Sequence, residues 1–168
     1  TYLDCGGNLL VSGQDLGYWE SGASGYLYAP YYRDRLKAVL LSDNAGSLQL
    51  TGSEHGPLES MALALNGPDS AQNQISPDSV AVDAPEHAQP LMRYSSIGLG
   101  GVAASLCLPY RSFYLSFGLE GAGDRVQRAE LLGAALDWFD SPRRMTGLRV
   151  SPTASQSIGP PASMMLAG

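Results

Sequence analysis

The chain has 168 residues, of which 44% are hydrophobic and 15% are charged, and its formal net charge is −6 at pH 7. These values are typical of a compact domain with a sizeable core. Nucleic acids bind clustered Lys and Arg, which this acidic chain lacks, and no apolar run reaches the roughly 20 residues that cross a bilayer. We therefore expect neither a nucleic-acid partner nor a membrane span.

The N-terminal region predicts one buried strand and one helix. Residues 1–3 have the pattern of a helix end before Gly6-Gly7, and the apolar run of Asn8–Ser12 is typical of a strand buried in a parallel sheet. Residues 17–30 combine Gly and Ser with aromatic residues and predict a loop. A helix should begin at Pro30, with one apolar face formed by Leu36, Val39 and Leu40.

The middle of the chain, residues 42–90, is rich in Gly, Pro, Asn, Asp and Ser. This composition predicts a long insertion with short strands at 47–50 and 61–65. Two further strands are expected at 102–108 and 112–117, separated by a turn at Pro109.

The strongest helix signal begins at Asp124, which can cap a helix, with Gln127 three residues later as in a capping box. Its apolar residues recur every three or four positions before Pro142, namely Val126, Ala129, Leu132, Leu136 and Phe139. Residues 145–168 are rich in Ser, Pro and Gly, which predicts a linker. The same residues could include the start of a β-sandwich module. Domain 1–144 is expected to be α/β, a flavodoxin-like three-layer sandwich with a mostly parallel sheet, and whether N-terminal units precede Thr1 stays open.

Cysteine, histidine and glycine patterns offer little catalytic or cofactor chemistry. Cys5 and Cys107 are compatible with two free thiols, with one bridge or with one reactive thiol, and neither has metal-ligand spacing. His55 and His87 lie in Gly- and Pro-flanked loops, which favours solvated side chains. The glycines of residues 98–103 match a dinucleotide fingerprint in spacing but not in context, so no cofactor is predicted.

A calcium site is the one metal hypothesis that the sequence raises. Asp43, Asn44, Asp69 and Asp78 could supply oxygen ligands, but no twelve-residue loop pattern organises them. Asp and Asn also form turns by bonding their own backbone, which is the reading we favour here. The sequence therefore predicts no metal site.

Four segments, in this order, resemble the glutamine-amidotransferase-like domains of large secreted bacterial proteins, which often accompany peptidase modules. They are YLDCGGNLLVSGQDLGYW, YLYAPYYRDRLKAVLLSDNAG, NQISPD and FYLSFGLEGAGDRVQRAELLGAALDWF, and the likeness covers roughly residues 1–140. The resemblance implies a secreted or cell-surface location and neighbouring domains in the same polypeptide as partners.

Active members of that family carry a cysteine on the turn after a buried strand and a later Phe-His-Pro-Glu run, in which the His activates the thiol. Here the turn of residues 11–15 reads VSGQD and has no cysteine. Gly118 occupies the position of the histidine, between the matching residues Phe117 and Glu120. The resemblance thus implies a domain that has lost its nucleophile and its base.

Three functions follow from this pattern. The first is a non-catalytic accessory or binding domain for a small molecule or peptide, with Gln14, Asp15, Tyr18, Trp19 and Glu120 around a retained crevice. The second is a hydrolase or amidotransferase-like enzyme that uses Ser12, or a thiol, with Glu120 as base. The third is a structural spacer between a peptidase and β-sandwich repeats.

Overall fold

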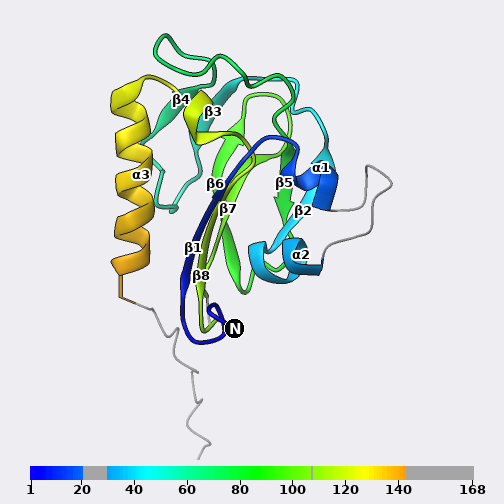
Figure 1. Ribbon diagram of the computed structural model, residues 1–168, viewed down its shortest axis with the longest axis vertical. Coiled ribbons are helices and arrows are strands. Elements are labelled where there is room, and N and C mark those ends of the chain that lie inside the picture. The colour runs from blue at the N-terminus through cyan, green and yellow to red at the C-terminus, as the bar shows by residue number, and fades with distance from the viewer. Residues whose placement is uncertain (21–29, 107, 143–168) are drawn as a thin grey trace, which may run out of the picture.

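The computed structural model describes residues 1–20, 30–106 and 108–142 (Figure 1). The described elements are mostly strands: β1 (Asn8–Ser12), β2 (Ala38–Ser42), β3 (Gln49–Gly52), β4 (Ala62–Ala64), β5 (Ser79–Val82), β6 (Ala88–Tyr94), β7 (Leu99–Ala104) and β8 (Arg111–Leu115). The helices are α1 (Leu16–Glu20), α2 (Pro30–Leu36) and α3 (Arg125–Asp140), with a short 3-10 turn at Leu119–Gly121. The predicted linker and possible sandwich module of residues 145–168 lie outside the described residues.

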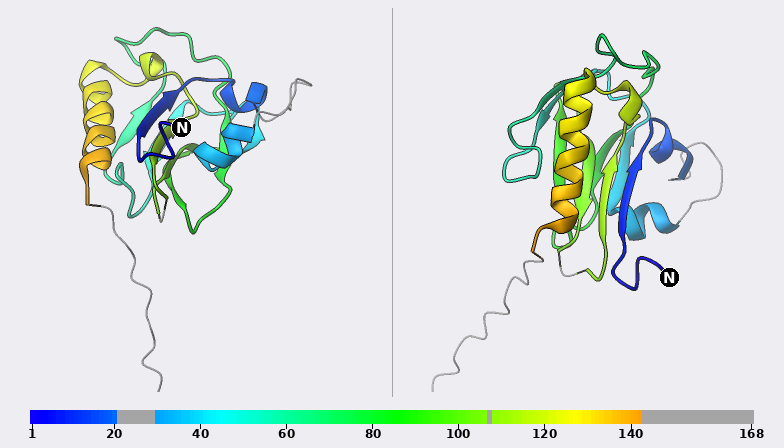
Figure 2. Two further views of the ribbon diagram at one scale, coloured as in Figure 1. Left: turned by 60° about the horizontal axis from the view of Figure 1, so that its bottom comes forward. Right: turned by 60° about the vertical axis from the view of Figure 1, so that its left-hand side comes forward.

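All eight strands belong to one curled, mixed sheet. The path runs β1-β8-β7-β6-β3-β4, and β5 joins β7 to β2. Only β1 and β8 are paired in parallel among the described strands, and the other pairs are antiparallel. Figure 2 shows the curled sheet from two further directions. The prediction of a flavodoxin-like three-layer sandwich with a mostly parallel sheet was therefore wrong.

The physical reason for this error lies in the middle of the chain. A parallel pair needs a crossover connection of a dozen or more residues, usually a helix. Between residues 42 and 110, however, Gly- and Pro-rich turns link the strands and leave room for antiparallel neighbours only. The apolar run of β1 did predict a parallel neighbour correctly, but β1 and β8 are the one parallel pair among the described strands.

Several local predictions can be compared with the elements. The strand at Asn8–Ser12 and the capping box of α3 are confirmed, but the expected burial of this strand was wrong, since β1 is partly buried at its centre and exposed at both ends. The short strands near 47–50, 61–65, 102–108 and 112–117 exist with shifted bounds. The prediction of a helix end at residues 1–3 was wrong, since these residues form a turn. The helix from Pro30 ends at Leu36, because Lys37 adopts φ 55 and the chain then enters β2.

The core lies on both faces of the sheet, and β8 runs through its centre. Phe113 and Leu115 belong to the cluster that also contains Leu131 and Ala135 of α3. Tyr114, between them in sequence, belongs to the cluster under α2. Side chains alternate between the two faces of a strand, so β8 supports both clusters, and every one of its residues is buried.

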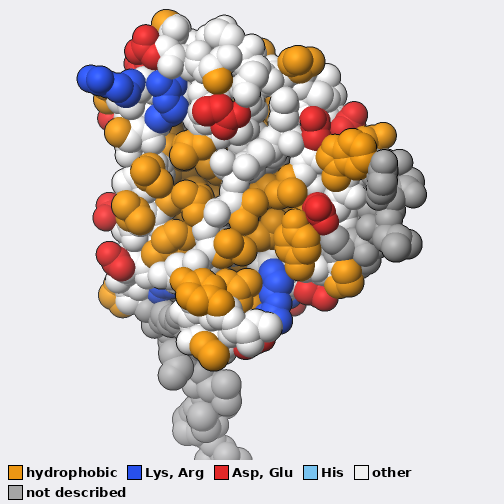
Figure 3. All heavy atoms as spheres, in the orientation of Figure 1, with side chains coloured by type: hydrophobic (Ala, Val, Ile, Leu, Met, Phe, Trp, Pro, Cys, Tyr) orange, Lys and Arg blue, Asp and Glu red, His pale blue; other side chains and the backbone are white. Residues whose placement is uncertain are grey.

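The side of helix α3 that packs on the sheet is not the side that the sequence predicted. Four residues of the predicted apolar face form a row that is exposed to solvent, here called the outer row: Val126, Ala129, Leu132 and Leu136. Val126, Leu132 and Leu136 are 62%, 40% and 55% exposed, while the buried positions are Leu131 and Ala135. Hydrophobic side chains also gather over β1 and the nearby face of the molecule (Figure 3). Within the described part of the chain, no helix combines the length and apolarity that crossing a membrane requires.

Arg111 joins the start of β8 to the end of α3. Its buried guanidinium donates hydrogen bonds to the carbonyls of Trp138 and Phe139, the latter at 2.8 Å, and to both oxygens of Ser141. The last carbonyls of a helix have no partner within the helix, and a nearby cation stabilises them. One side chain thus satisfies the C-terminus of α3 and anchors it beside the sheet.

Replacing Arg111 by Met should lower the free energy of unfolding by about 2–3 kcal/mol, because buried carbonyl groups lose a charged donor. Urea denaturation of the two proteins measures this difference. Arg93→Met, on an exposed strand position, is the matched control and should change stability by less than about 0.5 kcal/mol. Equal effects of the two substitutions would contradict the anchoring role.

Candidate functional site

The parallel pairing of β1 and β8 brings the turn after β1 next to the segment after β8. Ser12 is the register partner of Leu115, and the amide of Gly13 donates to the Leu115 carbonyl at 3.3 Å. The Leu119 amide donates to the Ser12 hydroxyl at 3.4 Å. Ser12–Asp15 and Gly118–Glu120, the two segments that the sequence singled out, therefore lie together at one end of the sheet.

A third segment, residues 73–76, holds these two together. The Gln14 side-chain amide donates to the Asn73 carbonyl at 3.0 Å, and its oxygen accepts from the amides of Ile75 and Ser76. The Gln14 side chain thus fixes the loop before β5 instead of facing an open crevice.

The Glu120 carboxylate and the buried Gln74 side chain form the centre of the site. Gln74 accepts a hydrogen bond from the Gly118 amide at 2.7 Å and donates to Glu120 at 3.3 Å. Asn73 donates a second side-chain bond to the same Glu120 oxygen at 3.0 Å. A Cβ at Gly118 would collide with the Glu120 carboxylate and lie 2.6 Å from the Gln74 amide nitrogen. A side chain at position 118 would therefore have to displace the ends of the Gln74 and Glu120 side chains.

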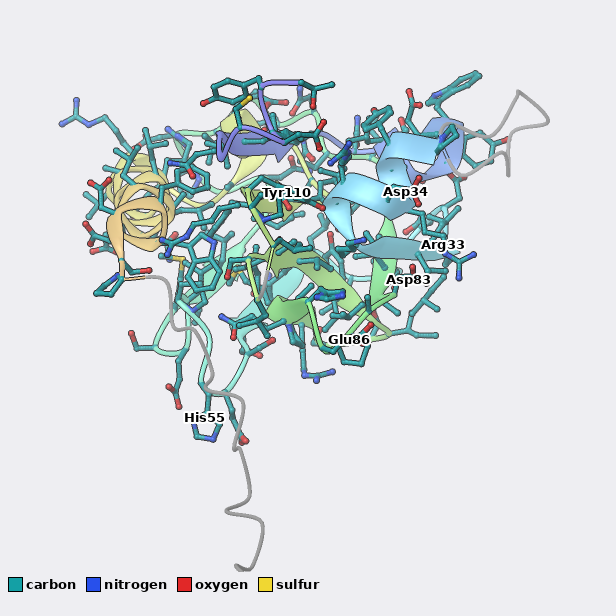
Figure 4. The ribbon with its side chains drawn as sticks, turned by 90° about the horizontal axis from the view of Figure 1, so that it is seen from below. Arg33, Asp34, His55, Asp83, Glu86 and Tyr110 are labelled. Atoms are coloured by element: carbon teal, nitrogen blue, oxygen red, sulfur yellow. The ribbon has the colours of Figure 1, made fainter. Side chains whose placement is uncertain are left out.

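Neither histidine and no described cysteine joins this group. His87 precedes Ala88, whose ladder partners lead through Ala104 to Ser112, so it lies at the opposite end of the sheet from Leu115. Its Nδ1 pairs with the Leu106 carbonyl at 3.0 Å. His55 is exposed on the loop between β3 and β4, far from β1 (Figure 4). Cys5 is a free, exposed thiol before β1, and Cys107 lies outside the described residues.

A cluster of three carboxylates lies beside this site. One oxygen each from Asp15, Asp43 and Asp78 lies within 4.8 Å of the others. Asp78 is completely buried, and its Oδ2 accepts from the amides of Gly17 at 2.5 Å and Tyr18 at 3.3 Å. Burial raises the pKa of Asp78 to about 7, and the negative charges of Asp15 and Asp43 add to this shift. Burial also raises the pKa of Asp15, with a further contribution from Asp43.

Two aromatic side chains of α1 follow Asp15 closely in the sequence. Tyr18 and Trp19 pack edge to face, with ring centroids 5.7 Å apart, and Trp19 is 47% exposed. Helix α1 was predicted to be a loop because residues 17–30 are rich in Gly and Ser. Gly17 is nevertheless required within the helix, since a Cβ there would lie 2.8 Å from Asp78 and 2.6 Å from the hydroxyl of Tyr32.

Two residues that organise the site, Asn73 and Gln74, carry no functional signal in the sequence. They belong to the NQISPD segment, but no spacing rule connects them with Gly118 or Glu120, which lie more than forty positions away. Asp78 and Asp43 were considered as cation ligands, but together with Asp69, whose backbone carbonyl contacts Arg128 instead. Asp15 was singled out for ligand binding and not as a member of this cluster.

Comparisons of the chain with models of known families, with curated proteins and with solved structures gave no match. The resemblance to amidotransferase-like domains therefore stays a prediction from the sequence.

Adding a methyl group at position 118 should strain the Gln74–Glu120 contact. Gly118→Ala is expected to lower the free energy of unfolding by about 1–3 kcal/mol, because the backbone there suits any residue but the space is filled. In a Gln74→Ala background the same substitution should cost at least about 0.5 kcal/mol less. A double-mutant cycle in urea measures this coupling.

Gly133→Ala is the control for this cycle. It lies in α3 with open space around its Cβ, so the substitution should stabilise the protein by about 0.5–1 kcal/mol. Strictly additive effects of Gly118→Ala and Gln74→Ala would show that the two side chains do not compete for the same space.

Proposed function

We propose that this chain is a non-catalytic accessory domain of a secreted, multidomain bacterial protein, associated with a peptidase module. Its polar sheet edge, where the turn after β1 meets the segment after β8, serves as a binding and docking element. The observation that carries the proposal is the filled space at Gly118, where Gln74 and Glu120 bond to the backbone and to each other.

The contacts of the two weak catalytic candidates support the absence of catalysis. The Ser12 hydroxyl is engaged with the Leu119 amide, and the Glu120 carboxylate accepts from the side chains of Asn73 and Gln74. A serine nucleophile needs a base within hydrogen-bond reach, and no bond joins Ser12 to Glu120 among the described residues. Loss of a nucleophile or base lowers a rate by about six orders of magnitude, so amide hydrolysis is not expected here.

The exposed apolar surface supports an accessory role with neighbouring domains of the same polypeptide as partners. The outer row of α3 presents Val126, Leu132 and Leu136 to solvent. β1 pairs with β8 on one side and forms the end of the described sheet path, so no described strand pairs with its second edge, where the Tyr2 hydroxyl bonds to the backbone of Asn8. Extended apolar patches and open strand edges are typical interaction sites. We infer that another domain of the polypeptide packs against this surface.

A serine-reactive probe tests the loss of catalysis. A fluorophosphonate should leave Ser12 unlabelled in the folded domain, and L-glutamine should release no ammonia above the blank, because none of the described residues bonds to Ser12 as a base. Iodoacetamide is applied in a Cys5→Ser background, since exposed Cys5 is expected to react as any free thiol does. Labelling of Ser12 or of a thiol that disappears in Glu120→Gln would favour the enzyme instead.

The docking surface is tested by hydrogen exchange. In the longer polypeptide, amides of β1 should exchange at least about tenfold more slowly than in the isolated domain, because a neighbouring domain covers the open edge. Leu132→Glu with Leu136→Glu should abolish this protection while changing the stability of the isolated domain by less than about 1 kcal/mol. Glu130→Gln, also exposed on α3, is the control. Equal exchange of β1 in both contexts would refute the docking role.

A further inference from the structure

The Asp78 carboxylate is a buried polar group whose hydrogen bonding is incomplete. Its Oδ2 accepts two backbone hydrogen bonds, whereas Oδ1 is buried and has no hydrogen-bond partner in the part of the chain that the structure describes. A buried carboxylate oxygen without a partner is costly, and buried charges are normally paired or coordinate a metal. The same carboxylate belongs to the cluster with Asp15 and Asp43, which adds two oxygen ligands and negative charge at this point.

We propose that Asp15, Asp43 and Asp78 form a binding site for one calcium ion, with water completing its coordination. Calcium binds carboxylate oxygens at about 2.3–2.6 Å and accepts irregular geometry. Two ligands of one ion are therefore at most about 4.6–5.2 Å apart, and the three oxygens, which all lie within 4.8 Å of one another, are close enough together to share one ion. Magnesium requires about 2.0–2.1 Å and near-ideal octahedral geometry and gives up its waters reluctantly, so a buried ligand such as Asp78 suits it less well.

Besides the two bonds to Asp78 Oδ2, hydrogen bonds that do not use the carboxylates position the backbone around the three ligands. The Asp78 amide donates to the Ser116 carbonyl, and the Ser116 hydroxyl donates to the Asp78 carbonyl at 2.6 Å. The Ser76 hydroxyl donates to the Asp43 carbonyl at 2.7 Å, and Gln14 ties the turn before Asp15 to residues 75 and 76. The backbone therefore holds the cluster together without help from the ion.

The arginine side chains of the neighbouring helix α2 form ion pairs with carboxylates outside the cluster. Arg33 of α2 bonds to Asp83, and Arg35 bonds to Asp4. Figure 4 shows Arg33 and Asp83 side by side. An ion at the cluster would neutralise the mutual repulsion of three carboxylates. It would also fix the start of α1, whose amides contact Asp78, and with it the aromatic pair Tyr18 and Trp19.

Titration calorimetry with calcium chloride on the chelator-treated protein tests this site. One ion should bind per chain, with a Kd between about 10⁻⁵ and 10⁻³ M, which extends from the weakest calcium sensors to extracellular modules. About 5 mM calcium should raise the Tm by mass action. Magnesium chloride should bind at least about tenfold more weakly. Absence of binding up to about 10 mM calcium, or magnesium binding as tightly as calcium, would overturn the assignment.

The variants locate the ion. Asp43→Asn removes an exposed carboxylate without disturbing the core and should weaken calcium binding at least about tenfold. Asp78→Asn keeps an oxygen that can accept from Gly17 and should have a larger effect. Asp69→Asn, an exposed aspartate outside the cluster, is the control and should bind calcium within about twofold of the wild type. Wild-type affinity in Asp43→Asn would refute the site, even if Asp78→Asn does not fold. The readout is independent of the proposed accessory role, which the probe and exchange experiments test separately.

Discussion

The parallel ladder between β1 and β8 is the constraint on which the rest of this molecule depends. It joins the N-terminal strand to a strand about a hundred residues later, with Leu10 opposite Phe113 and Ser12 opposite Leu115. Parallel strands place their carboxyl ends at the same edge of a sheet. The turn after β1 and the segment after β8 must therefore meet, and both the Gln74–Glu120 network and the carboxylate cluster form around this meeting point.

The site at this edge is polar but occupied by its own side chains. The positions at which the resemblance to amidotransferases predicts a thiol and an imidazole hold a serine bonded to a backbone amide and a glycine whose amide bonds to Gln74. A substituted histidine alone would therefore not restore a catalytic pair at Gly118. What the edge does offer is a buried carboxylate, that of Asp78, with one oxygen unpaired and two more carboxylates beside it.

Sequence patterns predicted the local features that depend on neighbouring residues. The capping box of α3 and the β1 strand are examples, because Asp124 bonds to Gln127 three residues away and an apolar run alone marks Asn8–Ser12. The architecture depended on connections that carry weak local signals, and there the prediction of a parallel three-layer sandwich failed. Periodicity found the apolar row of α3 but not its direction, since Leu131 and Ala135 complete a second apolar side that faces the core. The meeting of residues 12–15 with 118–120 was predicted from the resemblance. The role of Gln74 could not be predicted, because it arises only when three segments that are distant in sequence come together.

The most direct test of this account is the pairing of β1 with β8 in solution, measured by interstrand nuclear Overhauser effects in the labelled domain. The account predicts cross-peaks of a parallel ladder in the register of Leu10 with Phe113, together with contacts from the Gln74 side-chain amide to Gly118 and Glu120. An antiparallel pattern for β1, or a Gln74 amide without contacts to residues 118–120, would contradict the account.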